Sequence, residues 1–193
     1  MKKLTPTDLY KLEDYARERN AFRARVIAHK QPRTVHLGPH LTLVFEDRLT
    51  IQYQIQEMLR IERIFESEGV RDELDAYNPL IPDGTNLKAT MLIEYPDPAE
   101  RARKLVELHD IENRIALTVA GTAIRAIADE DLGRSTEEKT SAVHFLRFEF
   151  DAAQSAAFKH GGSAVLSVEH PAYTQRVTLP VATQNALAAD LDG

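Results

Sequence analysis

Three pairs of short β-rich runs, each joined by a tight-turn dipeptide, constrain the fold of this chain more than any other feature of its sequence. The runs are residues 34–37 and 41–45, 115–119 and 123–128, and 164–169 and 173–179. The dipeptides between them are Gly38-Pro39, Gly121-Thr122 and His170-Pro171. Such runs around turn residues are typical of β-hairpins, whose two strands are antiparallel.

Helical patterns fall between these hairpins without a regular strand–helix–strand order. Apolar periodicity and capping residues predict helices over residues 48–68, 70–77 and 98–109, and strands over residues 87–95 and 143–150. A doubly wound parallel sheet needs the regular alternation that is missing here. The sequence therefore predicts an α+β protein with a mixed or largely antiparallel sheet and inserted helices.

An N-terminal helical segment precedes the first hairpin. Thr5 followed by Pro6 is a typical helix start, because the hydroxyl can cap free backbone N–H groups and proline fits the first helical position. Asn20 is expected to break this helix before a second helical piece that ends near His29.

Two further segments are predicted as loops, and two short helices remain. Residues 78–84 hold two prolines and a glycine, and residues 129–140 are polar and acidic. Asp151 is expected to cap a short helix that ends at Gly161-Gly162, and residues 181–191 are weakly helical.

The chain is long enough to bury a core as one domain. We predict a single domain over residues 1–193, with a basic helical segment at 1–31 and an α+β body at 32–193. Residues 1–33 hold nine Lys or Arg against four Asp or Glu, a net charge of +5, whereas the whole chain has −6 and the remainder therefore −11.

Such a basic segment could be a nucleic-acid arm or a docking surface. Apolar residues recur among its charges at helical spacing, which a disordered arm would lack. We therefore expect it to dock on the acidic body or on a protein partner. We do not expect a nucleic-acid partner, and the sequence leaves an oligomer open.

Several classes of site are excluded by composition. The chain has no cysteine, so no iron–sulfur cluster can be ligated by Cys and no thiol can act as a nucleophile. No apolar run approaches the roughly 20 residues that a membrane helix needs, and the start is polar. The sequence also lacks the familiar phosphate-binding, esterase and metalloprotease motifs. We expect a cytoplasmic protein without a membrane partner.

His36 and His40 are the candidate ligands of a divalent metal ion. A helix is excluded because Gly38-Pro39 separates them, but a hairpin would set the two imidazoles on either side of its turn. A third ligand would come from elsewhere, with Glu57, Glu94 or His144 as the candidates. The alternative is a pair of exposed turn histidines.

The helix over residues 48–68 carries an unusual polar row, namely Gln52, Gln56, Arg60 and Arg63. Gln54 lies three residues after Ile51 and is expected to face inward. One interpretation is a ligand-binding wall in which Gln56 takes part, Arg60 binds an anion and Glu57 orients a hydrogen-bond donor. The alternative, which we favour, is a solvated face with a Glu57–Arg60 ion pair.

His144 is the remaining candidate ligand-binding residue. Strand alternation places it on one face with Leu146, Phe148 and Phe150. A histidine on such a face is more often a core residue with satisfied hydrogen bonds than a base or a ligand. Its neighbours could still tune it for acid–base chemistry.

Several longer segments together resemble a family of bacterial proteins classed as a domain of unknown function. They are Lys3-Leu4-Thr5-Pro6, Phe22-Arg23-Ala24-Arg25-Val26-Ile27, Leu37-Gly38-Pro39-His40, Ile55-Gln56-Glu57-Met58-Leu59-Arg60, Tyr77-Asn78-Pro79-Leu80-Ile81-Pro82, Tyr95-Pro96-Asp97-Pro98-Ala99-Glu100-Arg101 and Thr140-Ser141-Ala142-Val143-His144-Phe145-Leu146-Arg147-Phe148. The resemblance covers residues 3 to about 150.

Members of this family are often encoded beside a rubrerythrin and an iron–sulfur oxidoreductase. The resemblance therefore implies a cytoplasmic accessory protein in oxidative-stress redox chemistry, and it transfers no catalytic residue. Two hypotheses follow. The first is a binding or accessory protein that docks on a redox partner through the basic N-terminal helices and the 78–84 loop. The second is a metal- or small-ligand-binding enzyme built from the His, Glu and Arg residues above.

Overall fold

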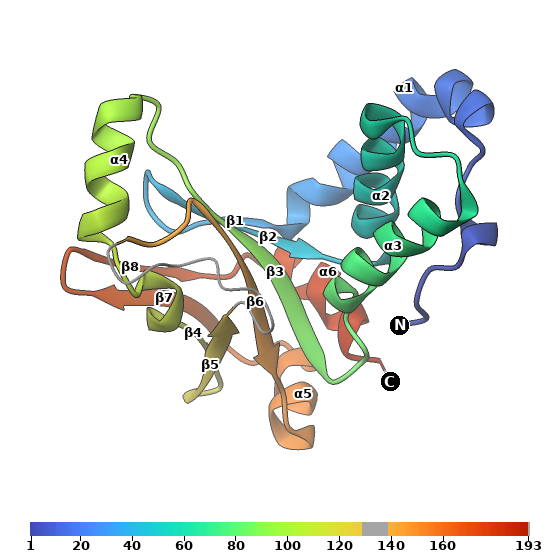
Figure 1. Cartoon of the computed structure of the whole chain (residues 1–193). Helices are drawn as coiled ribbons and strands as arrows, with labels where there is room; N and C mark the ends of the chain where they lie inside the picture. The colour runs from blue at the N-terminus through green and yellow to red at the C-terminus, as the bar shows by residue number, and fades with distance from the viewer. Residues whose placement is uncertain (129–138, 193) are drawn as a thin grey trace.

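The structure is a computed structural model that describes residues 1–128 and 139–192. In Figure 1 a group of helices from the N-terminal part of the chain stands at one end of a long sheet. The loop predicted over residues 129–140 lies for the most part outside the described residues. No helix within the two described ranges is long and apolar enough to cross a membrane.

The described strands form one eight-stranded sheet in the order β1-β2-β3-β6-β5-β4-β7-β8, and every neighbouring pair is antiparallel. The strands are β1 (Thr34–His36), β2 (Leu41–Glu46), β3 (Asn86–Ile93), β4 (Ile115–Val119), β5 (Thr122–Ala128), β6 (Val143–Glu149), β7 (Ala164–His170) and β8 (Tyr173–Thr178). The predicted α+β class with a largely antiparallel sheet is therefore confirmed.

All three predicted hairpins form, as the pairs β1–β2, β4–β5 and β7–β8. The pairing of β3 with β6 is different, because it joins segments far apart in the chain, from Asn86 opposite Glu149 to Leu92 opposite Val143. No turn signal connects these two strands. Their pairing follows from the apolar face that they share.

The sheet curls until β8 reaches the β1–β2 turn, so that the two ends of the strand order meet. The Tyr173 hydroxyl on β8 donates a hydrogen bond to the carbonyl oxygen of Leu37 at 2.5 Å and accepts one from the backbone N–H of His40 at 3.2 Å. Gly38 between them has φ +73°, and a Cβ there would lie 2.7 Å from the Tyr173 Oη. A residue without a side chain therefore allows this closure.

Three helices form what we call the head (residues 1–30 and 48–81), and the rest is the body. The head contains α1 (Leu12–Lys30), α2 (Arg48–Glu62) and α3 (Ser67–Tyr77). The body carries α4 (Pro98–Glu107), α5 (Ala152–Lys159) and α6 (Val181–Ala188). Short 3-10 turns occur at Pro6–Asp8, Gln31–Arg33, Asn78–Leu80, Ile111–Arg114 and Ala189–Leu191.

Several predicted helix boundaries are wrong. The helix start expected at Thr5-Pro6 opens only the 3-10 turn Pro6–Asp8, and α1 begins at Leu12. The break expected at Asn20 is absent, because α1 runs through this exposed position while Tyr15, Phe22 and Val26 keep one buried face. The helix expected over 48–68 ends at Glu62, and Arg63 turns the chain in a left-handed conformation with φ 55°.

Gly69, the expected end of that helix, instead lies inside α3, where a Cβ would meet the Ile64 Cγ2 at 2.7 Å. The turn lets α3 fold back against α2.

The head and the body have separate apolar cores. Alternate residues of β3, namely Leu87, Ala89, Met91 and Ile93, point into the body core, as their period of two predicts. Phe158 of α5 and Leu187 of α6 cover this core. The head has two smaller clusters, one around Ile51, Ile55, Leu59 and Leu74 and one made of Tyr15, Phe22 and Val26.

Candidate functional site

Glu57 joins α1 to α2 through a set of charged hydrogen bonds. Arg19 donates to both of its carboxylate oxygens at 2.8 Å, and the Tyr15 hydroxyl donates to Oε1 at 2.7 Å. Arg60 adds the anticipated pair on the same helix, with its Nη2 at 3.1 Å from Oε2. The Arg19 hydrogen bonds hold the pKa of Glu57 down, to about 2. The carboxylate is therefore engaged in fastening two helices together.

The glutamines of α2 hold the segment that leads into α1. The Oε1 of Gln56, which is fully buried, accepts a hydrogen bond from the Tyr10 backbone N–H at 2.6 Å, and the Nε2 of Gln52 donates to the Asp8 carbonyl at 2.6 Å. Within the described chain, the Nε2 of Gln56 has no hydrogen-bond partner. Gln54 is exposed, so the expectation that it faces inward is wrong. The buried face of α2 continues from Ile55 to Gln56 and not to residue 54, so residue 54 faces solvent.

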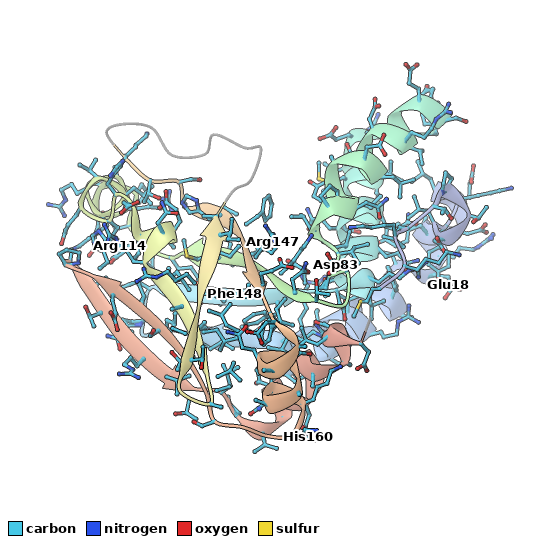
Figure 2. All side chains as sticks on the ribbon, turned by 90° about the horizontal axis from the view of Figure 1, so that it is seen from below. Glu18, Asp83, Arg114, Arg147, Phe148 and His160 are labelled. Atoms are coloured by element: carbon cyan, nitrogen blue, oxygen red, sulfur yellow. The ribbon has the colours of Figure 1, made fainter. Side chains whose placement is uncertain are left out.

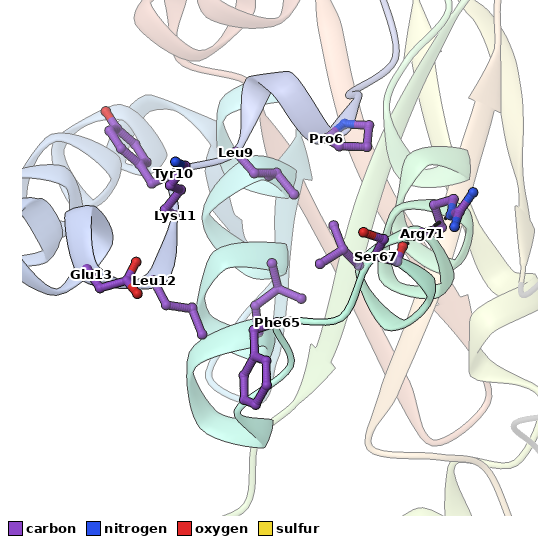
Figure 3. Close-up of a pocket in the computed structure, with 11 residues that line it drawn as sticks. Pro6, Leu9, Tyr10, Lys11, Leu12, Glu13, Phe65, Ser67 and Arg71 are labelled. Atoms are coloured by element: carbon purple, nitrogen blue, oxygen red, sulfur yellow. Dashed lines mark hydrogen bonds between the residues drawn. The ribbon is translucent and has the colours of Figure 1, made fainter.

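An apolar groove lies on the head where the segment before α1 faces the α2–α3 connection (Figure 3). It has a volume of about 800 Å³. Its apolar lining includes Leu9, Leu12, Leu59, Phe65 and Val70. Lys11, Glu13 and Arg71 supply charged side chains.

Phe65 is 73% exposed, although the apolar pattern places it on the buried face. No sequence pattern indicates this groove, because its position depends on where α2 ends.

His144 points into the body and is completely buried. The Thr140 hydroxyl donates to the Glu112 carboxylate at 2.8 Å and lies 2.7 Å from the His144 Nε2. Since a hydroxyl has one proton, the Nε2 must donate to this oxygen, and it also lies 3.0 Å from the Ser141 carbonyl. His144 therefore shares its buried face with Leu146 and Phe148 as a hydrogen-bonded core residue.

His36 and His40 line one cavity of about 720 Å³, at the end of the sheet where the β1–β2 turn meets the residues after β3. The Nδ1 of His36 lies 2.9 Å from the Thr42 hydroxyl, and the Nδ1 of His40 lies 3.0 Å from the Glu94 carbonyl oxygen. The His40 ring stacks on Tyr95, with ring centroids 4.0 Å apart and planes 15° apart.

Glu94, one of the proposed third ligands, lines the same cavity as the two histidines. The other two candidates, Glu57 and His144, have their hydrogen-bond partners in the head and in the body core. Among residues 1–128 and 139–192, no group of three or more His, Asp or Glu side chains is arranged to hold a metal ion. The structure thus separates the predicted site residues into three places: α2, the body core and the turn cavity.

A buried ion pair that the sequence did not reveal ties the C-terminus to the start of the sheet. Arg33 is 3% exposed and donates to both carboxylate oxygens of Asp190, which is fully buried, at 2.8 Å. Its Nη2 also lies 3.2 Å from the Asp47 carboxylate. Burial raises the pKa of Asp190. The two partners are 157 positions apart, so no local pattern could have paired them.

The basic residues of the first segment divide between internal pairs and open surface. Arg19 and Arg33 dock within the chain, on Glu57 and on Asp190. In the described part of the chain, Lys11, Arg23 and Lys30 have no carboxylate partner. The segment therefore docks partly on its own protein, as expected, and keeps several cations available to solvent.

Comparison with known proteins places this fold in a family. The family described as "Protein of unknown function (DUF3501)" matches residues 3–191. A crystal structure of a novel protein of unknown function from Burkholderia pseudomallei K96243 is 50% identical, with a TM-score of 0.94 over 99% of this chain and 100% of that one. A search of curated proteins finds no match. The resemblance to a domain of unknown function is thereby confirmed, and the chain belongs to the DUF3501 family.

Proposed function

We propose that this protein is a binding, accessory protein that docks on a redox partner through the groove of the head. The observation that carries this proposal is the apolar groove with Phe65 at its edge, 73% exposed. The described surface has seven large apolar residues that are well exposed, and four of them lie on the head: Tyr10, Ile27, Ile61 and Phe65. An apolar groove lined by exposed side chains, as Tyr10 and Phe65 line this one, is typical of a protein-binding surface.

Charge indicates what the partner presents to this groove. Lys11 and Arg71 line it against the single carboxylate of Glu13. Arg23 and Lys30, farther along α1, are further cations without a carboxylate partner in the described part of the chain. An apolar segment flanked by carboxylates complements this surface, because its charges would meet cations that no carboxylate within the described chain neutralises.

The resemblance implied a rubrerythrin and iron–sulfur oxidoreductase system in the cytoplasm, and we propose a partner of this kind. Without cysteine, the protein would serve oxidative-stress chemistry by positioning a redox protein and would leave Cys-ligated clusters to that protein.

The test uses purified rubrerythrin and purified iron–sulfur oxidoreductase from the same host, titrated against the full chain by calorimetry. Phe65→Ser is expected to weaken binding about tenfold, because an interface aromatic commonly contributes more than 1 kcal/mol. Val181→Ser is the matched control, since Val181 on the body is 74% exposed. No binding to either protein, or equal weakening by both substitutions, would refute the proposal.

A second candidate function, a metal- or small-ligand-binding enzyme, is favoured by one observation. His36, His40, Glu94 and Arg101 line the same cavity. The sequence also predicts Glu57, Arg60 and His144 for this site, but these residues have their hydrogen-bond partners elsewhere. The second candidate therefore depends on the turn cavity alone.

A further inference from the structure

The hydrogen bonds of the turn cavity determine which nitrogen of each histidine carries a proton. Thr42 donates its single hydroxyl proton to the Glu94 carboxylate, with the oxygens 2.5 Å apart. Its oxygen must therefore accept from the Nδ1–H of His36. The Glu94 carbonyl can only accept, so the His40 Nδ1 also carries a proton. In both neutral imidazoles the lone pair is then on Nε2.

This arrangement is the one that metal-binding histidines use. A ligating imidazole typically donates its other ring N–H to a carbonyl or a carboxylate-linked group, which fixes the tautomer and the ring orientation. His40 is further held by the Tyr95 ring, and His36 is linked through Thr42 to the side chain of Glu94. Glu94 thus orients both histidines, one through its backbone and the other through its carboxylate.

We propose that His36 and His40 bind one divalent transition-metal ion through their Nε2 atoms. Imidazole nitrogen suits Zn²⁺, Ni²⁺ and Cu²⁺ and does not suit Mg²⁺ or Ca²⁺. Because the described chain assembles no third ligand, the remaining positions on the ion would be open to water or to a small ligand.

Arg101 lines the same cavity and has no carboxylate partner within the described residues, so an anionic ligand on the ion would meet a cation there. This site rests on the second candidate function proposed above and is independent of the docking groove on the head.

The first experiment titrates Zn²⁺, and separately Mg²⁺, into metal-free protein by calorimetry. One equivalent of Zn²⁺ is expected to bind, and Mg²⁺ is not. His36→Ala and His40→Ala should each weaken Zn²⁺ binding about tenfold or more. His160→Ala is the control, because His160 is exposed at the end of α5 (Figure 2). Absence of Zn²⁺ binding, or wild-type affinity in both cavity variants, would overturn the proposal.

His40→Ala also removes the stack on Tyr95, so a loss of Zn²⁺ binding in this variant could come from a folding defect. Two further measurements separate loss of a ligand from loss of structure. Thr42→Val keeps both ligands and removes the acceptor of the His36 Nδ1–H, and it should weaken Zn²⁺ binding several-fold. In the wild-type protein, ¹⁵N NMR of the imidazoles should show Zn²⁺ perturbing Nε2 of His36 and His40 and leaving Nδ1 protonated. Coordination through Nδ1, or an unchanged affinity in Thr42→Val, would contradict the assignment.

Discussion

The head and the body are stabilised in different ways. In the body, alternate residues of long strands form one continuous apolar core, covered by α5 and α6. In the head, three helices share two small clusters and depend on polar contacts such as the Glu57 hydrogen bonds. Large apolar side chains of the head remain exposed to water, and these exposed side chains make the head the better candidate for a binding surface.

The same arginine–carboxylate chemistry also behaves differently in the two regions. In the body, the Arg33 and Asp190 side chains are 4% and 1% exposed, and burial raises the pKa of Asp190. In the head, the Arg19 and Glu57 side chains are 31% and 14% exposed, and the arginine lowers the pKa of Glu57 to about 2. For Asp190, desolvation raises the pKa more than the ion pair with Arg33 lowers it. For Glu57, the hydrogen bonds lower the pKa more than desolvation raises it.

The largest loss of stability is expected from breaking the buried Arg33–Asp190 ion pair. Arg33→Met leaves the Asp190 carboxylate buried without its partner and should lower the free energy of unfolding by about 3–5 kcal/mol. Urea unfolding at pH 7 measures this change. The double variant Arg33→Met, Asp190→Leu should recover most of the loss, because the unpaired Asp190 carboxylate is then gone and the buried Asp47 carboxylate keeps the Leu49 and Thr50 N–H groups and His29 as partners. A single variant as stable as wild type would show that the pair is not needed.

A smaller loss is expected where the sheet closes. Gly38→Ala places a Cβ 2.7 Å from the Tyr173 Oη at φ +73° and should destabilise the protein by about 2–3 kcal/mol. Gly121→Ala is the control, because its φ is +87° but nothing lies within 4 Å of the added carbon. Thermal unfolding should show the larger drop for Gly38→Ala. Equal drops would mean that the Tyr173 contact does not matter.

The next largest loss of stability is expected from removing the Glu57 carboxylate, which joins α1 to α2 in the head. Glu57→Gln should lower stability at pH 7 by about 1–2 kcal/mol, a value reduced because Arg19 is partly exposed. The pKa of Glu57 in the folded protein lies below the 4.5 of an unperturbed glutamate, so this stabilisation is present above about pH 4.5 and is lost as the pH falls toward 2.

Urea unfolding at several pH values should therefore show the wild type and the Glu57→Gln variant converging in acid. Glu62→Gln, an exposed change on the same helix, should show neither the loss nor the convergence. A gap between wild type and Glu57→Gln that stays constant down to pH 2 would contradict the assignment.

The smallest effect on stability is expected at the groove. Phe65→Ser should change the free energy of unfolding by no more than about 0.5 kcal/mol, since most of the ring is already in water. Ile55→Ala, a fully buried position on α2, should lower it by about 2–5 kcal/mol. Urea unfolding compares the two. A large loss from Phe65→Ser would mean that the ring serves the head's own packing and not a partner.

The features that the sequence predicted correctly depend on neighbouring residues. The three hairpins follow from turn dipeptides, and the helix starts at Asp97 and Asp151 follow from side chains that cap free N–H groups three residues on. The buried face of His144 follows from strand alternation. The sequence did not predict the end of α2 at Glu62, because the left-handed residue that ends the helix is Arg63 and not a glycine.

By itself, then, the sequence determined the antiparallel α+β class and placed His36 and His40 around one turn. Only the tertiary structure decided which groups meet: β3 with β6, Arg33 with Asp190, and Glu94 with the two histidines. The reason is physical. Turns and caps are set by interactions over a few residues, whereas these pairings form only when the apolar faces of distant segments are buried together.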